Sequence, residues 1–389
     1  MIYASTDRRY LFSIWEHCKI LTFWFHKLHT KMEITTASKK YFTTSLTAWH
    51  ETANNRSLPW KREKDPYKIW LSEVILQQTR AQQGLPYYLR FIEAYPTIQD
   101  MAAADEEQAF RLWQGLGYYN RCKNMLATAR YISNELRGRF PGSYEELLKL
   151  KGIGPYTAAA IASFASGLPY SVVDGNVYRV LARYFGLAIP FDTTDGKKAF
   201  SSLAQELLDK KNSAAYNQAI MDLGATVCTP RNPLCDQCPL QKKCIAYHDG
   251  LITILPVRSK KQSVRKRYFH YLLLKWKDTI WIHKRTGSDI WENLYEPYLI
   301  ENSRPLNTKE LLKHKGFKEI NITYINLKYE GNITQRLTHQ VIDTRFFSVY
   351  LAKKPKISAL NSKWSGINSL KKTAFPKTLV SFLENNLYF

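Results

Sequence analysis

Residues 150–158 read LKGIGPYTA, and this stretch contains the turn that decides the fold. Gly152 and Gly154 flank the apolar Ile153, and glycine adopts positive φ angles without steric cost, so we expect a tight turn around a buried anchor. Pro155 suits the first turn of a following helix, where no backbone N–H is needed. The pattern predicts two helices joined by a short hairpin whose outward N–H groups favour an anion such as phosphate.

The same pattern also fits an ordinary packing corner between two helices, so further motifs are needed to interpret it. About twenty residues downstream, Asp174 and Gly175 precede another apolar repeat of helical spacing. Aspartate is a preferred residue at a helix start, where the helix dipole favours the ionised carboxylate. Asp174 is therefore either a simple helix cap or a carboxylate presented for chemistry.

Residues 40–227 are predicted to be helical, with short interruptions. Apolar residues recur there at three- and four-residue spacing, the period of one face of an α-helix. The interruptions contain glycine or proline, which often end helices. The predicted helical segments are 67–80, 106–114, 121–136, 144–150, 156–166, 174–186, 197–210 and 214–226, and the predicted breaks are 84–86, 115–117, 152–155 and 167–169.

From residue 268 the pattern changes to alternation that is rich in aromatic and β-branched side chains. Such alternation is typical of β-strands. We expect a strand-rich second domain with helices near 308–315 and 376–386. The expected strands lie within 268–276, 278–285, 295–301, 320–329 and 341–352.

Four cysteines lie within seventeen residues at the spacing C-x6-C-x2-C-x5-C. Thiolates so close in sequence can converge on one metal centre. The spacing by itself is compatible with a four-cysteine zinc site or with a [4Fe–4S] cluster. The predicted metal ligands are Cys228, Cys235, Cys238 and Cys244.

The protein is strongly basic, with 56 lysines and arginines against 33 aspartates and glutamates and a formal charge of +23 over 389 residues. Residues 258–389 hold 25 of the basic and 10 of the acidic residues. The run 258–267 carries six basic residues and no acidic one, so it is either a solvated interdomain linker or a segment that contacts phosphate. The positive excess makes a polyanion the first partner to consider.

Composition excludes several other classes of protein. A hydrophobic content of 45% excludes an intrinsically disordered chain, and six cysteines are too few for a disulfide scaffold of this length. The most apolar stretch, residues 11–25, is interrupted by Glu16 and Lys19, so neither a membrane span nor a signal peptide is expected. Cys18 and Cys122 are expected to be free thiols, which persist in a reducing compartment. We therefore expect a soluble protein of the cytoplasm, which would associate with the nucleoid if the protein is bacterial.

Together, the hairpin, Asp174 and the cysteine spacing resemble the helix-hairpin-helix DNA glycosylase superfamily, and within it the MutY-type adenine DNA glycosylases. Further matching stretches are LPW at 58–60, WLSEVILQQT at 70–79, GLGYY at 115–119 and NQAIMDLG at 217–224. The resemblance is nearly free of gaps over about 50–250 and weaker over 268–389. It implies a multidomain protein: an all-α helix-hairpin-helix glycosylase body with an iron–sulfur cluster loop, followed by an α+β Nudix-like domain.

The resemblance also implies domain boundaries. Residues 1–31 match nothing in the family, so we expect Met32 to be the natural start and the upstream stretch to be a mis-called extension. N-terminal sequencing of the native protein tests this expectation. The implied parts are the helical glycosylase domain at 32–227, the cluster loop at 228–250, a basic linker at 251–267 and the Nudix-like domain at 268–389.

The activity implied by the resemblance is hydrolytic removal of adenine mispaired with 8-oxoguanine or guanine, after the adenine is flipped out of the duplex. Glu73 is implied as the general acid that protonates the base and later activates water, a role that needs a raised pKa. Asp174 is implied as the ionised carboxylate that stabilises the cationic sugar. Tyr156 and Asn176 would position Asp174 and the sugar.

Position 156 separates two reaction types. Bifunctional glycosylase/lyases of the superfamily have a lysine there, which forms a Schiff base with the sugar. This chain has Tyr156, and no lysine lies between Lys151 and Lys197. We therefore expect a monofunctional glycosylase that leaves an abasic site.

Five residues are implied around the flipped base and the gap that it leaves. Arg56, Trp60 and Gln218 would surround the adenine, and a glutamine side chain can pair with an adenine edge through two hydrogen bonds. Gln78 and Tyr118 would fill the gap in the duplex. Packing in the core is an alternative for Tyr118.

Other implied contacts involve the hairpin and the C-terminal domain. Lys151, Gly152 and Gly154 would contact the DNA backbone. Thr338 and His339 would recognise 8-oxoguanine, although the family's usual Phe-Ser-His is Leu-Thr-His here, which keeps a hydroxyl. No run has the spaced acidic residues of a true Nudix box, so we do not expect pyrophosphohydrolase activity.

The cofactor implied by the resemblance is one [4Fe–4S] cluster with a structural role, because its loop is separate in sequence from Glu73 and Asp174. The implied partner is double-stranded DNA that contains A:8-oxoguanine or A:G mispairs. We expect no membrane partner. A monomer is expected because no oligomerisation signal appears.

Three alternative functions remain. A thymine or uracil mismatch glycosylase of the same superfamily can also carry tyrosine at position 156, but the extra C-terminal domain argues against it. A non-catalytic lesion-binding protein is disfavoured by the presence of Glu73, Asp174 and Tyr156 together. An unrelated zinc-finger-like DNA binder would explain the cysteines and the charge but not the hairpin.

Overall fold

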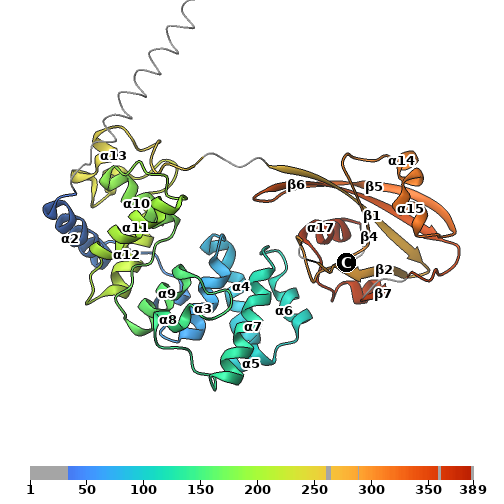
Figure 1. The fold of residues 1–389 in the computed structure, drawn as a ribbon, viewed down its shortest axis with the longest axis horizontal. Coiled ribbons are helices and arrows are strands. Elements are labelled where there is room, and N and C mark those ends of the chain that lie inside the picture. Colours follow the sequence, from blue (N-terminus) through green and yellow to red (C-terminus); the bar gives the residue numbers. More distant parts are fainter. Residues whose placement is uncertain (1–33, 260–263, 288, 358–360, 387–389) are drawn as a thin grey trace, which may run out of the picture. The chain divides into compact units, whose positions relative to one another are not determined.

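The computed structural model describes residues 34–259, 264–287, 289–357 and 361–386 (Figure 1). The predictions for residues 1–31 and for Cys18 fall outside these ranges. The chain divides into two compact units. One contains residues up to 69 together with 142–144 and 155–260, and the other contains 70–141, 145–154 and 261–389.

The first unit is helical, and its core is formed by helices from distant parts of the chain. Apolar side chains such as Leu46, Leu181, Phe200 and Leu223 are buried together. Its elements are α2 (Thr36–Thr52), η1 (Pro59–Arg62), α9 (Pro155–Ser166), α10 (Gly175–Phe185), α11 (Thr194–Leu207), α12 (Ser213–Thr226), η2 (Cys235–Gln237), η3 (Gln241–Lys243) and α13 (Ile245–His248).

The second unit begins within α3 (Pro66–Leu76) and contains a second set of helices. Phe91 and Trp113 pack edge to face there, with ring centroids 5.8 Å apart, and both are fully buried. Cys122 is a buried free thiol, as expected from the sequence. The further helices are α4 (Ala81–Ala94), α5 (Ile98–Ala103), α6 (Glu106–Trp113), α7 (Asn120–Glu135) and α8 (Tyr144–Leu147).

The prediction of helices over 40–227 is confirmed, but two details are wrong. The predicted break at 84–86 does not exist, because α4 continues through Gly84 and Pro86. A Cβ at Gly84 would lie 2.7 Å from Leu76 Cδ2, so this glycine serves close helix packing and does not mark a helix end. The helix predicted over 67–80 stops at Leu76, since Gln78 has a φ of +57°.

The second unit also holds one mixed seven-stranded sheet, which confirms the strand-rich C-terminal domain (Figure 1). Its order is β3-β2-β1-β6-β5, with β4 paired to β1 and β7 paired to β2, and only β1 and β6 run parallel. The strand β7 was not predicted. The strands are β1 (Arg265–Trp276), β2 (Thr279–Lys284), β3 (Tyr295–Glu296), β4 (Tyr298–Asn302), β5 (Tyr324–Arg336), β6 (Gln340–Leu351) and β7 (Ser362–Gly366).

Alternate residues of β1 pack on opposite faces of this sheet. Phe269 and Leu273 belong to the core that includes Phe382 of α17 (Lys377–Asn385). Leu272 belongs to the core that includes Leu311 and other residues of α14 (Thr308–Lys313) and α15 (Lys315–Glu319). The two-residue period of a strand therefore explains how helices cover both faces. The remaining helix is α16 (Ile367–Leu370).

Candidate functional site

The predicted hairpin joins α8 to α9 and reverses the chain at one glycine. Gly152 has a φ of +79°, and a Cβ there would lie 2.9 Å from the Cβ of Asn124. Gly154 does not adopt a positive φ, so the expectation of left-handed backbone at both glycines is wrong. Ile153 is buried as the anchor, and the chain enters α9 directly at Pro155, so one left-handed residue suffices for the turn.

The surface of the hairpin is open to a partner. Lys151, Gly152 and Gly154 are exposed, and a Cβ at Gly154 would meet no atom within 4 Å. The carbonyl of Lys151 accepts a hydrogen bond from Thr128 Oγ1 at 2.7 Å, which fixes the turn to α7. The predicted backbone-contacting residues therefore form a rigid, exposed turn in the second unit.

Glu73 lies on α3 in the second unit and is only 6% exposed. Leu71 and Val74 beside it are buried as well. A buried position is compatible with the predicted general-acid role of Glu73.

Gln78 and Tyr118, the two predicted wedge residues, both lie in strained turns of the second unit. Gln78 is exposed with a φ of +57°, and Tyr118 is 47% exposed with a φ of +51°. Left-handed backbone is unfavourable for residues with side chains, so the surrounding structure must hold these turns in place. The exposure of Tyr118 shows that the alternative of core packing is wrong for this residue.

Arg121 ties the two wedge-bearing turns together. Its guanidinium donates to the carbonyls of Val74, Ile75 and Gln77 at 2.8, 3.0 and 2.7 Å, and to that of Gly117 at 3.2 Å. It thereby satisfies carbonyl groups that the C-terminus of α3 leaves without helical partners. Desolvation lowers the pKa of Arg121 to about 10, so the side chain stays charged at neutral pH.

Asp174 caps the N-terminus of α10 in the first unit, as predicted. Its Oδ1 accepts from the backbone N–H groups of Asn176 and Val177, both at 2.8 Å, and its Oδ2 accepts from Asn176 Nδ2 at 2.7 Å. Burial raises the pKa of the Asp174 carboxyl above its ordinary value, while these hydrogen bonds and the charge of Arg179 act in the opposite direction. The carboxylate is thus held by three hydrogen bonds, while its burial disfavours the charged form.

Tyr156 lies on α9, also in the first unit, and is partly buried. It packs with Ala159, Ala160 and Val172 in a small cluster. Val172 lies two residues before Asp174, so Tyr156 packs beside the segment that leads into the carboxylate.

Two of the three predicted base-contacting residues converge on a carboxylate that the sequence analysis did not select, Asp222. Its oxygens accept from Arg56 Nη1 at 2.8 Å and from Gln218 Nε2 at 3.1 Å. Lys61 and Asn54 also donate to it, at 2.5 and 2.7 Å. Asp222 is completely buried.

Gln218 and Lys61 line a pocket of about 390 Å³ within the first unit. Phe164, Ser213 and Lys64 also contribute to its wall. Trp60, the third predicted base-contacting residue, lies in η1 and is partly buried. One of the three predicted base-contacting residues, Gln218, therefore lines a pocket that has lysine side chains in its wall.

The four predicted metal ligands surround one cavity in the first unit. Cys228, Cys235, Cys238 and Cys244 line it together with Arg183. Within the described ranges, no three histidine, cysteine or acidic side chains close on a single-ion site. Four thiols around a cavity that includes a buried arginine form a donor set suited to either anionic centre that the spacing allows, a four-cysteine zinc site or a [4Fe–4S] cluster.

Two buried arginines of α10 hold the loop that carries these cysteines. Arg183 Nη1 donates to the carbonyl of Thr229 at 2.8 Å and lies 3.5 Å from Cys228 Sγ. Arg179 Nε donates to the carbonyl of Cys228 at 2.7 Å, and its Nη2 donates to Asn176 Oδ1 at 2.8 Å. One helix therefore supports both the cysteine loop and the residues around Asp174.

Thr338 and His339 are exposed in the turn between β5 and β6 in the second unit. The N–H of Leu337 donates to the carbonyl of Gln340 at 2.8 Å and closes the turn. The hydroxyls of Thr338 and Tyr118 form a hydrogen bond. The structure thus brings together one predicted lesion-contacting residue and one predicted wedge residue.

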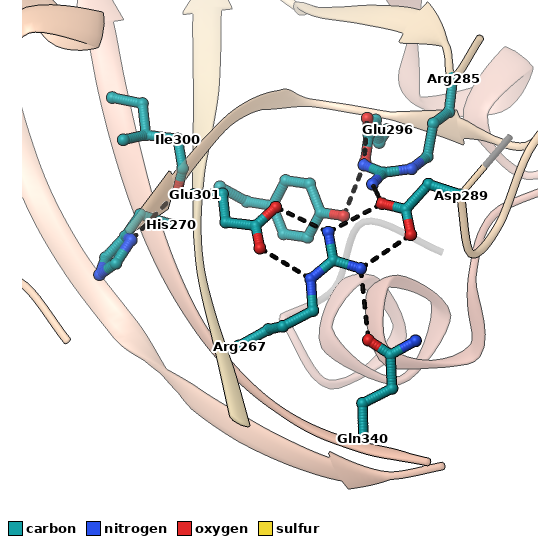
Figure 2. Close-up of polar contacts among 9 residues, drawn as sticks. Arg267, His270, Arg285, Asp289, Glu296, Ile300, Glu301 and Gln340 are labelled. Atoms are coloured by element: carbon teal, nitrogen blue, oxygen red, sulfur yellow. Dashed lines mark hydrogen bonds and ion pairs between the residues drawn. The ribbon is translucent and has the colours of Figure 1, made fainter. Parts of the chain in front are cut away.

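An ionic network around Arg267 includes Gln340, the first residue of β6 after this turn (Figure 2). Arg267 pairs with Glu301 at 2.7 and 2.6 Å and with Asp289 at 2.8 Å, and it also donates to Gln340 at 3.3 Å. These contacts hold the pKa of Asp289 well below its usual range. The interpretation of the run 258–267 as solvated or phosphate-contacting is therefore wrong for Arg267, which is 7% exposed within β1.

Sequence reasoning assigned no role to Arg121 or Asp222, although Arg121 lies just after one quoted stretch and Asp222 lies within another, 217–224. Arg121 follows the stretch GLGYY at 115–119 by two residues, and Asp222 lies four residues after Gln218 on the same helix. An acidic residue at that spacing can accept from a glutamine, which is a signal available in the sequence. No local signal pairs Asp222 with Asn54 and Arg56.

Three protein families match separate parts of the chain. Residues 71–209 match the HhH-GPD superfamily of base excision DNA repair proteins. Residues 228–244 match the iron–sulfur binding domain of endonuclease III, and residues 270–385 match the NUDIX domain. These matches confirm the predicted fold class, including an iron–sulfur motif at the four cysteines.

Individual proteins are also similar to this chain in sequence or in structure. The adenine DNA glycosylase of Buchnera aphidicola subsp. Schizaphis graminum is 36% identical over 254 residues, which cover 65% of this chain and 73% of that protein. The adenine DNA glycosylase of Homo sapiens is 42% identical over 214 residues, covering 53% of this chain and 39% of that protein. A solved thermostable thymine-DNA glycosylase superposes with a TM-score of 0.51 at 29% identity, covering 56% of this chain and all of that structure.

Proposed function

Because this chain belongs to the adenine DNA glycosylase family, we propose that it removes adenine mispaired with 8-oxoguanine or guanine in double-stranded DNA. The reaction is hydrolysis of the N-glycosidic bond, and the product is an abasic site. The observation that carries the proposal is Asp174, a carboxylate held by two backbone N–H groups and one side-chain amide at the start of α10.

Asp174 and Glu73 divide the chemistry. Glu73, which is buried on α3, protonates the adenine ring so that it leaves as a neutral base, and then activates the attacking water. Asp174 in its ionised form stabilises the positive charge that develops on the sugar. Asn176 holds the Asp174 carboxylate, and Tyr156 supports the segment before it.

Hydrolysis is favoured over lyase chemistry by the residue at position 156. A Schiff base needs an amine nucleophile, and Tyr156 has none. The enzyme is therefore monofunctional.

The exposed turns of the second unit would engage the DNA. Gln78 and Tyr118 enter the gap left by the flipped adenine, and Lys151, Gly152 and Gly154 contact the phosphate backbone. Thr338 and His339 at the β5–β6 turn contact 8-oxoguanine. The support for these roles is the exposure of Tyr118 and of the hairpin.

One [4Fe–4S] cluster held by Cys228, Cys235, Cys238 and Cys244 would complete the first unit. When bound, it supplies a structural cross-link of the loop from 228 to 244 and takes no part in bond cleavage. Arg183 offers a positive charge beside Cys228, which suits an anionic cluster.

A single-turnover assay on an A:8-oxoguanine duplex, developed with alkali to reveal abasic sites, tests the proposal. We expect alkali-dependent cleavage at the adenine strand, and its loss in Glu73→Gln and Asp174→Asn. A parallel G:T duplex tests the alternative suggested by the similar thymine-DNA glycosylase. Thymine release without adenine release would overturn the proposal, and cleavage without alkali that depends on Glu73 would contradict monofunctional chemistry.

A further inference from the structure

Asp222 forms the centre of a polar cluster in the first unit. Its side chain is fully buried and accepts hydrogen bonds from Arg56, Lys61, Asn54 and Gln218. The first three come from the segment after α2, more than 160 residues away in sequence. The fourth lies on the same helix, one turn before Asp222.

The contact with Gln218 fixes the orientation of its amide. A carboxylate paired with Arg56 and Lys61 has only acceptor oxygens, so the group of Gln218 that faces Asp222 must be the NH₂ donor. The reversed orientation would place two acceptor oxygens against each other. Among the described residues, Oε1 of Gln218 accepts no hydrogen bond, and this side chain lines the 390 Å³ pocket.

We propose that Asp222 is a positioning residue for base selection, because it holds Gln218 with the amide oxygen free to accept from a base that carries an exocyclic amino group. This inference rests on the proposed function. The Gln218 Nε2 group has two hydrogens, and Asp222 accepts through one contact, so the second hydrogen stays available beside Oε1. Gln218 therefore offers a base one acceptor, Oε1, and one donor, the second hydrogen of Nε2.

This acceptor and donor complement the hydrogen-bonding edge of adenine but not that of a 6-oxopurine. The adenine edge presents the N6 amino donor next to the N7 acceptor, whereas guanine presents two acceptors, O6 and N7. Hypoxanthine has the same O6 in place of the amino group. A fixed Gln218 oxygen therefore attracts adenine and faces an oxygen in hypoxanthine, whereas an amide free to rotate would accept either base.

The test compares two substrates within each protein. Duplexes with adenine or hypoxanthine opposite 8-oxoguanine are cleaved under single-turnover conditions, and the ratio of the two rates is the readout. The ratio cancels differences in active fraction and in general stability between variants. A merely structural role for Asp222 would change both rates together and leave the ratio unmoved.

Two comparisons address the two residues. Gln218→Met keeps the length of a half-buried side chain but removes both polar groups, and it is compared with the wild type. Lys61→Met with Asp222→Leu removes one positive and one negative charge together, so the net charge of the cluster is kept, and leucine offers no acceptor to Gln218. This double variant is compared with Lys61→Met alone. Thermal unfolding of each variant confirms that it is folded.

We expect the adenine-to-hypoxanthine ratio to fall about tenfold in Gln218→Met and in the double variant, the effect of one hydrogen bond to a base edge. An unchanged ratio in Gln218→Met overturns the inference, and so does a double variant whose ratio equals that of Lys61→Met. A double variant that fails to fold while Lys61→Met folds also counts against it, because Asp222 would then act in folding. If the wild type releases no adenine, the proposed function fails instead.

Discussion

Gly224 on α12 lies so close to Asn176 on α10 that a Cβ at Gly224 would be 2.6 Å from the Asn176 Cβ. The carbonyl of Gly224 also accepts from Arg179 Nη2 at 2.5 Å, and the same guanidinium nitrogen donates to Asn176 Oδ1. Asn176 in turn donates to Asp174. The close contact of two helices therefore determines where the Asp174 carboxylate is held.

Replacing Gly224 with alanine tests this contact. The added methyl must push α12 away from α10, because the atoms that it meets include the backbone carbonyl of Asn176 at 3.0 Å. We expect a loss of about 1–3 kcal/mol in the free energy of unfolding and a fall in the adenine excision rate of at least tenfold. Denaturant unfolding and single-turnover excision measure the two effects. Gly142→Ala is the matched control, since a Cβ there meets nothing within 4 Å, and equal effects of both changes would contradict the prediction.

The raised pKa of Asp174 predicts opposite effects of one substitution on stability and activity. At neutral pH the burial of the ionised carboxylate disfavours the folded state. This cost is absent below the unfolded pKa, where both states are protonated, and it appears as the pH rises from there through the folded pKa. Asparagine is also a good helix cap. We therefore expect Asp174→Asn to unfold at the same or a higher temperature than the wild type at pH 7, while adenine excision is lost.

Asn176 gives a prediction for the pH dependence of the reaction. Its side-chain and backbone N–H groups both lower the pKa of Asp174, and only the side-chain contribution is lost in Asn176→Ala. The pKa of Asp174 then rises further, so less of the carboxylate is ionised at a given acidic pH. We expect the acidic limb of the single-turnover rate to move to higher pH in this variant. A limb that stays in place or moves to lower pH would disprove the assignment of Asp174 as the ionised group.

Arg121 is predicted to hold the wedge-bearing turns. Arg121→Lys keeps the charge but cannot donate to the carbonyls of Val74, Ile75 and Gln77 together. We expect a loss of about 1.5–3 kcal/mol in unfolding free energy and a larger fall in excision rate than in binding of undamaged duplex. Arg130→Lys on the same helix is the control, because its two contacts with carbonyls are long, 3.4 and 3.3 Å. Wild-type excision by Arg121→Lys would refute the role.

The cysteine loop is predicted to depend on Arg183. Arg183→Met removes donors to the carbonyls of Thr229, Pro230 and Leu255, which are left without this partner. We expect the purified variant to contain less iron per chain and to lose the broad absorbance near 400 nm that such clusters show. Iron analysis and visible spectroscopy check this. A colourless wild-type protein that contains zinc would instead overturn the cluster assignment itself.

The sequence by itself predicted the elements whose cause is local. The hairpin at 150–158 was predicted from the glycine that reverses the chain and the proline that starts α9, and Asp174 was predicted as a cap from its position before an apolar repeat. The four cysteines are close enough in sequence for their spacing to carry the information. Helical and strand periods likewise separated the helical body from the sheet at the C-terminal end.

Tertiary structure decided what depends on contacts between distant residues. Local propensity suggested a break at Gly84 and Pro86, but packing against Leu76 keeps α4 continuous. The basic character of Arg267 suggested solvent or phosphate, but its guanidinium pairs with Glu301 and Asp289 and its side chain is only 7% exposed. Three of the four partners of Asp222 lie more than 160 residues away, because hydrogen bonds act over a few ångströms in space and sequence separation does not limit them.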